Sequence, residues 1–223
     1  MNKRMLLKAI AGLSAAFCIG LTGGQGLAKT ASGATGPVLA VISHPVKDYA
    51  AWKPIYDAAA PIRAKAGVTG AEVFHDPADP NKLVILHRFK TVAAEAAFMA
   101  DPDLKAAMDK GGVTAAPTAI VASGKAGAAS TGLGPVLAII SHPVKDFAAW
   151  HVAYEAAEPI RRKAGVTGAE VFQDPKNPNA VVIIHRFKTV ADAKGFLADP
   201  DLKAAMDKGG VTAAPSVIIA VKN

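Results

Sequence analysis

The sequence predicts an α+β protein built from two tandem copies of one small domain. Residues 36–122 and 134–220 align at a constant shift of 98 positions without a gap, and 22 of the 87 paired positions differ. A repeat of this length is too long for a solenoid unit and long enough to fold as a domain. The function is therefore expected either in one copy, used twice, or in a cleft between the copies.

Each copy begins with a pattern typical of a strand followed by a helix. Val38–Ser43 is a short apolar run rich in β-branched residues, which indicates a buried strand. Asp48 is a good N-cap for a helix from Tyr49 to about Ala66. We expect Pro61 in the first copy and Pro159 in the second to kink or break this helix. Pro54 is expected to add a kink in the first copy alone.

The remainder of the copy predicts a hairpin, a second helical region and a last strand. The expected elements are strands over Val68–Phe74 and Leu83–Phe89, helices over residues 91–99 and 101–110, and a strand over Thr118–Ala122. The order β-α-β-β-α-β is that of a ferredoxin-like domain, a four-stranded antiparallel sheet in the order 4-1-3-2 with both helices on one face. Because the strands are apolar on both faces, the open face must be covered. Two such sheets packed face to face would cover each other.

The N-terminal residues are expected to be a signal peptide. Residues 1–28 have a basic start, an apolar stretch and a Gly-Leu-Ala ending, which is the order of a secretory signal. This predicts an exported protein, periplasmic or secreted, with no stable membrane insertion after cleavage. Cys18, the single cysteine, would leave with the signal, so the mature chain would have no disulfide. Residues 123–133 are rich in Gly, Ala and Ser and are expected to form a flexible linker before the second domain at 134–223.

Composition argues against several classes of partner. The formal net charge of +7 includes three positive charges in residues 1–28, which leaves +4 for the rest of the chain. Basic and acidic residues alternate, and no basic run is interleaved with aromatic residues, so nucleic acid is not an expected partner. The chain has no Gly-rich phosphate loop after a strand. The spacing His44-x-x-x-Asp48 could bind a metal, but Asp48 is better explained as a helix cap, so no metal site and no cofactor are predicted.

The repeated motif resembles the antibiotic biosynthesis monooxygenase-like superfamily of dimeric α/β barrels. The residues that carry the resemblance are Ser43-His44, Asp48-Tyr49-x-x-Trp52-Lys53, Arg63, Gly67-Val68-x-Gly70 and Asp79-Pro80-Asn81, most of which recur in the second copy. The resemblance implies that sheets pair into a barrel, within one chain or by exchange between two. It also implies candidate activities, namely cofactor-independent oxygenation of quinol- or anthrone-like aromatics, or haem degradation. The haem-degrading site is not carried over, since residues 91–110 contain no histidine and the third strand contains no Trp.

Four histidines are the candidate catalytic residues. His44 and His142 follow an apolar strand and precede a proline, where each could act as a general base at a barrel mouth or bond to the nearby backbone. His87 and His185 lie within the third strand on an apolar face and must be hydrogen-bonded, either lining a cavity or as satisfied core residues. Since His44 and His87 would lie roughly 15 Å apart in one sheet, we expect such pairs to approach only across the two copies.

Aromatic residues on the first helix are the candidate substrate-binding residues. Trp52 and Tyr56, with Trp150 and Tyr154 in the second copy, form a stripe at helical spacing, which is typical of core packing and could alternatively line a pocket. Arg88 and Arg186, on the opposite face of the third strand, are expected to form salt bridges with Glu72 or Glu170 on the adjacent strand.

These patterns leave three hypotheses open. The first is a barrel around an apolar cavity that acts on a small hydrophobic or aromatic molecule as a cofactor-independent monooxygenase or a related isomerase. The second is a non-catalytic module that binds or carries such a molecule. The third is an assembly or stress protein with no pocket, which a barrel interior filled by side chains would favour. Fold membership alone does not decide between them.

Overall fold

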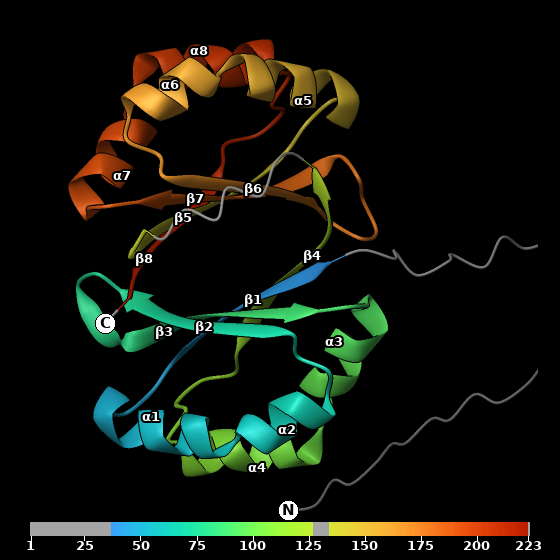
Figure 1. Ribbon diagram of the computed structural model, residues 1–223, viewed down its shortest axis with the longest axis vertical. Helices are drawn as coiled ribbons and strands as arrows, with labels where there is room; N and C mark the ends of the chain where they lie inside the picture. Colours follow the sequence, from blue (N-terminus) through green and yellow to red (C-terminus); the bar gives the residue numbers. More distant parts are fainter. Residues whose placement is uncertain (1–36, 127–133, 223) are drawn as a thin grey trace, which may run out of the picture. The chain divides into compact units, whose positions relative to one another are not determined.

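The computed structural model describes residues 37–126 and 134–222, so the expected signal peptide at residues 1–28 lies outside the described residues. Each copy folds into four strands and four helices, as Figure 1 shows. The first copy consists of β1 (Val38–Pro45), α1 (Tyr49–Ala58), α2 (Ala60–Lys65), β2 (Gly70–Asp76), β3 (Asp79–Phe89), α3 (Val92–Met99), α4 (Pro102–Lys110) and β4 (Thr118–Ala126). The second consists of β5 (Val136–Pro143), α5 (Phe147–Ala156), α6 (Glu158–Lys163), β6 (Gly168–Gln173), β7 (Ala180–Phe187), α7 (Val190–Leu197), α8 (Pro200–Lys208) and β8 (Ser216–Val221).

Local capping explains where the first helix of each copy begins. The Asp48 carboxylate accepts hydrogen bonds from the backbone N–H groups of Ala50 and Ala51, as predicted for an N-cap. Asn81, near the start of β3, accepts a further hydrogen bond from the Tyr49 N–H at 2.8 Å. Asp48 and Asn81 therefore serve the fold, because together they satisfy the free N–H groups at the start of α1.

The prolines of the first helix act differently from one another. Pro61 lies in the first turn of α2, where its missing N–H costs nothing, and the helix breaks at Ala59 as predicted. Pro54 does not interrupt the helix, since it lies inside α1, which spans the same ten positions as α5 with Val152 in its place. The Pro54 side chain is exposed, so it is tolerated inside the helix at the expense of one backbone hydrogen bond.

The eight strands form one closed barrel within a single chain. The order around the barrel is β1-β3-β2-β8-β5-β7-β6-β4, so each copy has the predicted internal order and the copies join at two seams. One seam pairs His75 of β2 with Val221 of β8, and the other pairs β4 with β6. β4 is longer than expected and continues to Ala126, because its last residues pair with β6 and close the barrel. Residues 123–126 are thus strand rather than linker, and residues 127–133 lie outside the described residues.

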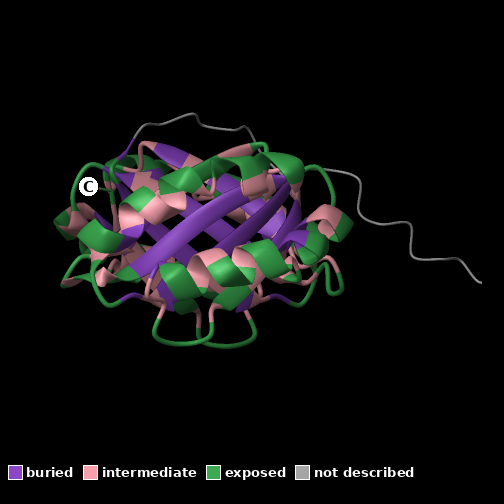
Figure 2. Ribbon diagram, turned by 90° about the horizontal axis from the view of Figure 1, so that it is seen from below, coloured by how far each residue is buried: buried purple, intermediate pink, exposed green. Residues whose placement is uncertain are grey.

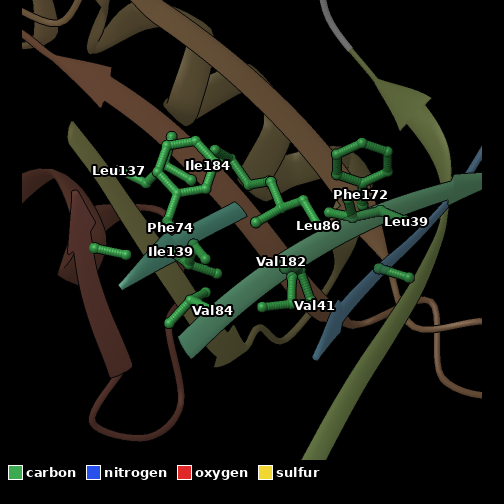
Figure 3. Close-up of a cluster of buried hydrophobic side chains, with 12 residues drawn as sticks. Leu39, Val41, Phe74, Val84, Leu86, Leu137, Ile139, Phe172, Val182 and Ile184 are labelled. Carbon is green, nitrogen blue, oxygen red and sulfur yellow. The ribbon is translucent and has the colours of Figure 1, made fainter. Parts of the chain in front are cut away.

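Alternate residues of each strand face two different cores. The inner cluster fills the barrel and contains residues of both copies, namely Leu39, Val41, Phe74, Val84, Leu86, Ala122, Leu137, Ile139, Phe172, Val182, Ile184 and Ala220. Figure 3 shows these side chains pointing toward one another from strands of the two repeats. The two outer clusters lie between each sheet and the helices of its own copy. Figure 2 shows the buried strands between the largely exposed helices.

The filled interior corrects one expectation drawn from the sequence. A cavity inside the barrel was predicted, but large side chains such as Phe74 and Phe172, each at most 1% exposed, occupy that space. The prediction that one sheet covers the other is confirmed. The space between the two sheets is filled by side chains. The space for a ligand lies instead on the outer face of each sheet, under the helices, so the filled interior does not favour a protein without a pocket.

Two salt bridges cross the barrel from one copy to the other. The sequence predicted a carboxylate partner for each arginine on the adjacent strand of the same copy, but the partner belongs to the other copy. Arg88 Nη2 lies 2.7 Å from Glu170 Oε2, and Arg186 Nη2 lies 2.7 Å from Glu72 Oε1. Burial alone would raise the pKa of Glu72, but the hydrogen bond and the charge of Arg186 outweigh it and lower this pKa. The exchange follows from the curvature of the barrel, which brings inward-facing residues of both copies together.

Candidate functional site

Each repeat contains a cavity between the outer face of its sheet and its own helices. The cavity of the second repeat has a volume of about 210 Å³, and that of the first repeat about 50 Å³. Both are lined mainly by aliphatic and aromatic side chains. The polar residues of the larger cavity are His142, Tyr154, Arg161 and His185. An apolar pocket with a few convergent polar groups is the usual form of a small-molecule site.

Two strands place the histidines of the second repeat on the wall of this cavity. His142 ends β5 and His185 lies within β7, and both side chains point outward, toward the helices. The β5–β7 register pairs His142 with Val181 and His185 with Ala138, so the histidines lie four positions apart along the sheet. The expected separation within one copy agrees with this register. The expected approach across the copies is wrong, because the packed barrel interior separates the histidines of one copy from those of the other, and the two histidines of a copy instead line one cavity.

A hydrogen-bonded pair of rings joins helix α5 to strand β7. The Tyr154 hydroxyl lies 3.1 Å from His185 Nε2, and the two rings are nearly parallel, with 6.1 Å between their centres. Burial raises the pKa of Tyr154 to about 12, although the charge of Arg161 opposes this. Burial, with a smaller contribution from Arg161, lowers the pKa of His185 to about 3. Both rings are therefore neutral at physiological pH.

Arg161 was part of the sequence motif but was not predicted as a site residue. Its guanidinium carbon lies 3.9 Å from the centre of the Tyr154 ring, and its Nη1 donates a hydrogen bond to the Tyr154 carbonyl oxygen. Arg161 lies seven residues after Tyr154 in the sequence. The helix break before α6 turns its side chain back over α5, where it reaches Tyr154. The sequence indicated this residue only as an arginine one turn after the helix break, at the same place in both repeats. That pattern assigned it no chemical role.

The four histidines carry buried nitrogen atoms without a hydrogen-bond partner among the described residues. These atoms are Nδ1 of His44, His87, His142 and His185. In the larger cavity, His142 is 4% exposed and His185 is 2% exposed. A buried polar atom without a partner is unfavourable by about 1–3 kcal/mol, so such atoms call for an explanation. A hydrogen-bonding group of a bound molecule would supply the missing partner.

The aromatic stripe predicted on the first helix forms one wall of the cavity. Trp150 packs on Tyr154 with 5.1 Å between ring centres and meets the edge of His142 at 5.7 Å. The two readings of this stripe therefore both hold, since Trp150 is buried in the outer core and also lines the cavity. The rings run in one connected series from His142 through Trp150 and Tyr154 to His185.

The first repeat places the same chemical groups around a smaller cavity. Tyr56 lies 3.1 Å from His87 Nε2, and Trp52 stacks on Tyr56 with ring centres 4.7 Å apart. Burial, with a smaller contribution from the charge of Arg63, lowers the pKa of His87 to about 4. His44 lines this cavity as well, and burial lowers its pKa.

The buried histidines predict a loss of stability in mild acid. Because His87 and His185 have folded pKa values of about 4 and about 3, below the ordinary value of 6.5, the unfolded chain binds more protons below pH 6.5. The stability is complete above pH 6.5 and falls as the pH decreases toward these folded values. Urea unfolding at pH 7 and pH 5 should show a loss of about 2 kcal/mol for each histidine. Equal stability at the two pH values would contradict this assignment.

Two structural features are absent from the described residues. No group of three or more His, Cys, Asp or Glu residues in the described ranges is arranged to hold a metal ion. Asp48, one half of the candidate metal pair, caps α1 as predicted. Among the helices of residues 37–126 and 134–222, none is long and apolar enough to cross a membrane.

An eight-stranded barrel formed by two ferredoxin-like units, with a cavity under the helices of each, places this chain among the dimeric-type α/β barrel proteins. Residues 146–208 match the model of the antibiotic biosynthesis monooxygenase family, and this segment contains Trp150, Tyr154, Arg161 and His185. The resemblance seen in the sequence is thereby confirmed, with two tandem copies of the domain in one chain.

Solved structures of similar fold cover both repeats. A proposed monooxygenase from Lactobacillus acidophilus NCFM aligns with a TM-score of 0.54 and 16% identity, over 83% of this chain and 93% of its own. An anthrone oxidase-like protein aligns with a TM-score of 0.55 and 13% identity, over 86% of this chain and 92% of its own. Identities this low show the fold alone. Among curated proteins, none matches the sequence significantly.

Proposed function

We propose that the second repeat binds a small aromatic molecule that carries a hydroxyl or carbonyl group, and oxidises it with molecular oxygen without a cofactor. The observation that carries the proposal is the apolar 210 Å³ cavity lined by two nearly fully buried histidines, each with an Nδ1 atom that has no partner among the described residues. The walls match an aromatic body, and the histidine nitrogens match one or two polar substituents. The family match at residues 146–208 supports oxygenation as the reaction.

The two histidines of this cavity suit different roles. Burial lowers the pKa of His142, so its imidazole is neutral and can accept a proton at neutral pH. His185, with its pKa lowered to about 3, is a much weaker base. We assign proton removal to His142 and orientation of the substrate oxygen to His185 and Tyr154. Trp150 would stack against the substrate rings.

Anthrone is the test substrate, because one structure of similar fold is described as anthrone oxidase-like. In the reaction, His142 removes a proton from the methylene carbon opposite the carbonyl, and the resulting anion passes electrons to O2. A carbon–oxygen bond forms, and the peroxide then loses water as its O–O bond breaks. The methylene group becomes a second carbonyl, so anthrone and O2 give anthraquinone and one water. The substrate supplies all four electrons, and no other reductant takes part.

A non-catalytic carrier is the second candidate function. The pKa of about 3 for His185 favours it, since the more buried of the two histidines can donate or accept a hydrogen bond but scarcely takes up a proton. In this case the same cavity would hold the molecule and release it unchanged. The two candidates share the site and differ only in whether product forms.

Oxygen uptake with anthrone distinguishes the two candidates. For the enzyme, we expect the full chain to consume one O2 for each anthraquinone formed, and His142→Ala to lower kcat about 100-fold or more. His75→Gln is the matched control, because Gln173 occupies this place in the second repeat and His75 lies outside both cavities. Binding of anthrone without oxygen uptake would select the carrier. Neither binding nor uptake would overturn both.

We further propose that the protein acts outside the cytoplasm, as a periplasmic or secreted protein. Support comes from the basic start, apolar stretch and small-residue ending of residues 1–28. Intact-mass measurement of the protein from an exported fraction should give a chain that begins at Lys29. A full-length mass in the cytoplasmic fraction would contradict this.

A further inference from the structure

The two cavities have the same chemistry and different volumes. Of the residues that line the smaller cavity, thirteen are identical in the second repeat, and the two that differ are Ile55, which corresponds to Ala153, and Met99, which corresponds to Leu197. Met and Leu have similar volumes, and exchanges between them are usually tolerated. Ile55 has three more side-chain carbon atoms than Ala153, so of the two differences it is the one that reduces the space in the first repeat.

The volumes decide which cavity has room for an aromatic ring. An apolar cavity of about 150 Å³ binds benzene, whereas one water occupies about 30 Å³ of liquid. The cavity of the second repeat, at about 210 Å³, is larger than this benzene-binding cavity. The cavity of the first repeat, at about 50 Å³, has room for little more than a water molecule.

From these observations we infer that one chain binds one aromatic molecule, in the second repeat. The residue at position 55 or 153 decides whether the cavity of its repeat has room for that molecule. The inference rests on the proposed function of the cavity and adds its stoichiometry and its size-determining residue. Ile55 fills the space in the first repeat that the ligand rings occupy in the second. His44, Tyr56 and His87 remain in place around a cavity that is too small for an aromatic ring.

Position 55 is suited to this role because of where it lies on the helix. Ile55 is adjacent to Tyr56 and one turn from Trp52, so its side chain shares the cavity wall with both rings. The polar pair of Tyr56 and His87 has the same 3.1 Å hydrogen bond as Tyr154 and His185. A change at position 55 therefore alters the available volume while leaving the hydrogen-bonding groups intact.

Calorimetric titration of the full chain with 1-naphthol tests the inference. The wild-type chain should bind one equivalent, and Ile55→Ala should bind two. Ala153→Ile should weaken binding roughly tenfold or more, because the added atoms occupy the ligand space. The double variant Ile55→Ala with Ala153→Ile should again bind one equivalent, now in the first repeat, which also shows that the chain remains folded. Val152→Ala, at a 71% exposed position beside Ala153, is the matched control and should leave stoichiometry and affinity unchanged.

The outcomes separate this inference from the proposed function. Two equivalents bound by the wild-type chain, or undiminished binding by Ala153→Ile, would overturn the inference and leave the proposed function intact. No binding by the wild-type chain and by Ile55→Ala would overturn the proposed function itself. One equivalent for the wild type and two for Ile55→Ala would support both.

Discussion

Replacement of Phe74 by alanine is expected to lower the free energy of unfolding by about 3–5 kcal/mol. Phe74 is fully buried in the barrel interior, where it packs with residues of both repeats. Its ring also lies 6.0 Å from the Arg186 guanidinium carbon and 5.6 Å from Lys222 Nζ. Because strands of two repeats surround this side chain, the cavity left by alanine cannot collapse without disturbing the closure of the barrel.

Urea unfolding of the purified full chain measures this effect. Since a domain is typically stable by only 5–15 kcal/mol, a loss of this size is a large part of the total. Val152→Ala is the control, because Val152 is 71% exposed and its truncation should change the stability by less than about 0.5 kcal/mol. A loss below about 1 kcal/mol for Phe74→Ala would show that the barrel interior is less tightly packed than described.

Removal of the Tyr154–His185 pair is expected to weaken ligand binding without a matching loss of stability. Tyr154→Phe alone leaves both nitrogens of His185 without a partner and should destabilise the protein by about 1–3 kcal/mol. Addition of His185→Leu should restore most of this loss, because replacement of both members of a buried hydrogen bond by apolar groups is often close to neutral. The same double variant should bind 1-naphthol roughly tenfold more weakly or worse, since the ligand hydroxyl loses its partners.

A double-mutant cycle with the wild type, both single variants and the double variant separates these effects. Unfolding by urea gives the stability of each variant, and titration with 1-naphthol gives its affinity. The corresponding pair Tyr56→Phe and His87→Leu in the first repeat is the matched control, and it should change stability in the same way without changing affinity. Wild-type affinity in the Tyr154→Phe, His185→Leu variant would show that the pair does not contact the ligand.

The fold could be predicted closely because its signals are local. Capping by Asp48, the break at Pro61 and the short apolar, β-branched runs of the strands depend on near neighbours in sequence, and the structure confirms each of them. The apolar character of both sheet faces predicted that the second sheet covers the first. The closure of the barrel within one chain could not be read from the sequence, since a pair of chains could satisfy the same pattern.

The sequence drew attention to histidines that line cavities, but it did not predict where those cavities lie. His44, His142, His87 and His185 all line cavities, yet the sequence directed attention to the barrel interior because two apolar sheet faces suggested an enclosed space. Whether side chains fill such a space depends on the distance between the sheets, which the sequence does not encode locally. The exchange of arginine partners between copies was missed for the same reason, because the partner strands are far apart in sequence.

The crossed pairs of Arg88 with Glu170 and Arg186 with Glu72 have a consequence for how such a barrel can change over evolutionary time. In a barrel assembled from two identical chains, every substitution appears in both halves at once, so a mutation that closes one cavity closes both. Here a single chain supplies both halves, and the copies must stay complementary only where they meet, which is in the inner cluster, at the two seams and at the salt bridges. Positions outside those contacts, such as 55 and 153, are free to differ. Because the two halves are joined in one chain, they can accept different substitutions. One half can therefore keep a ligand cavity while the other serves only to complete the barrel.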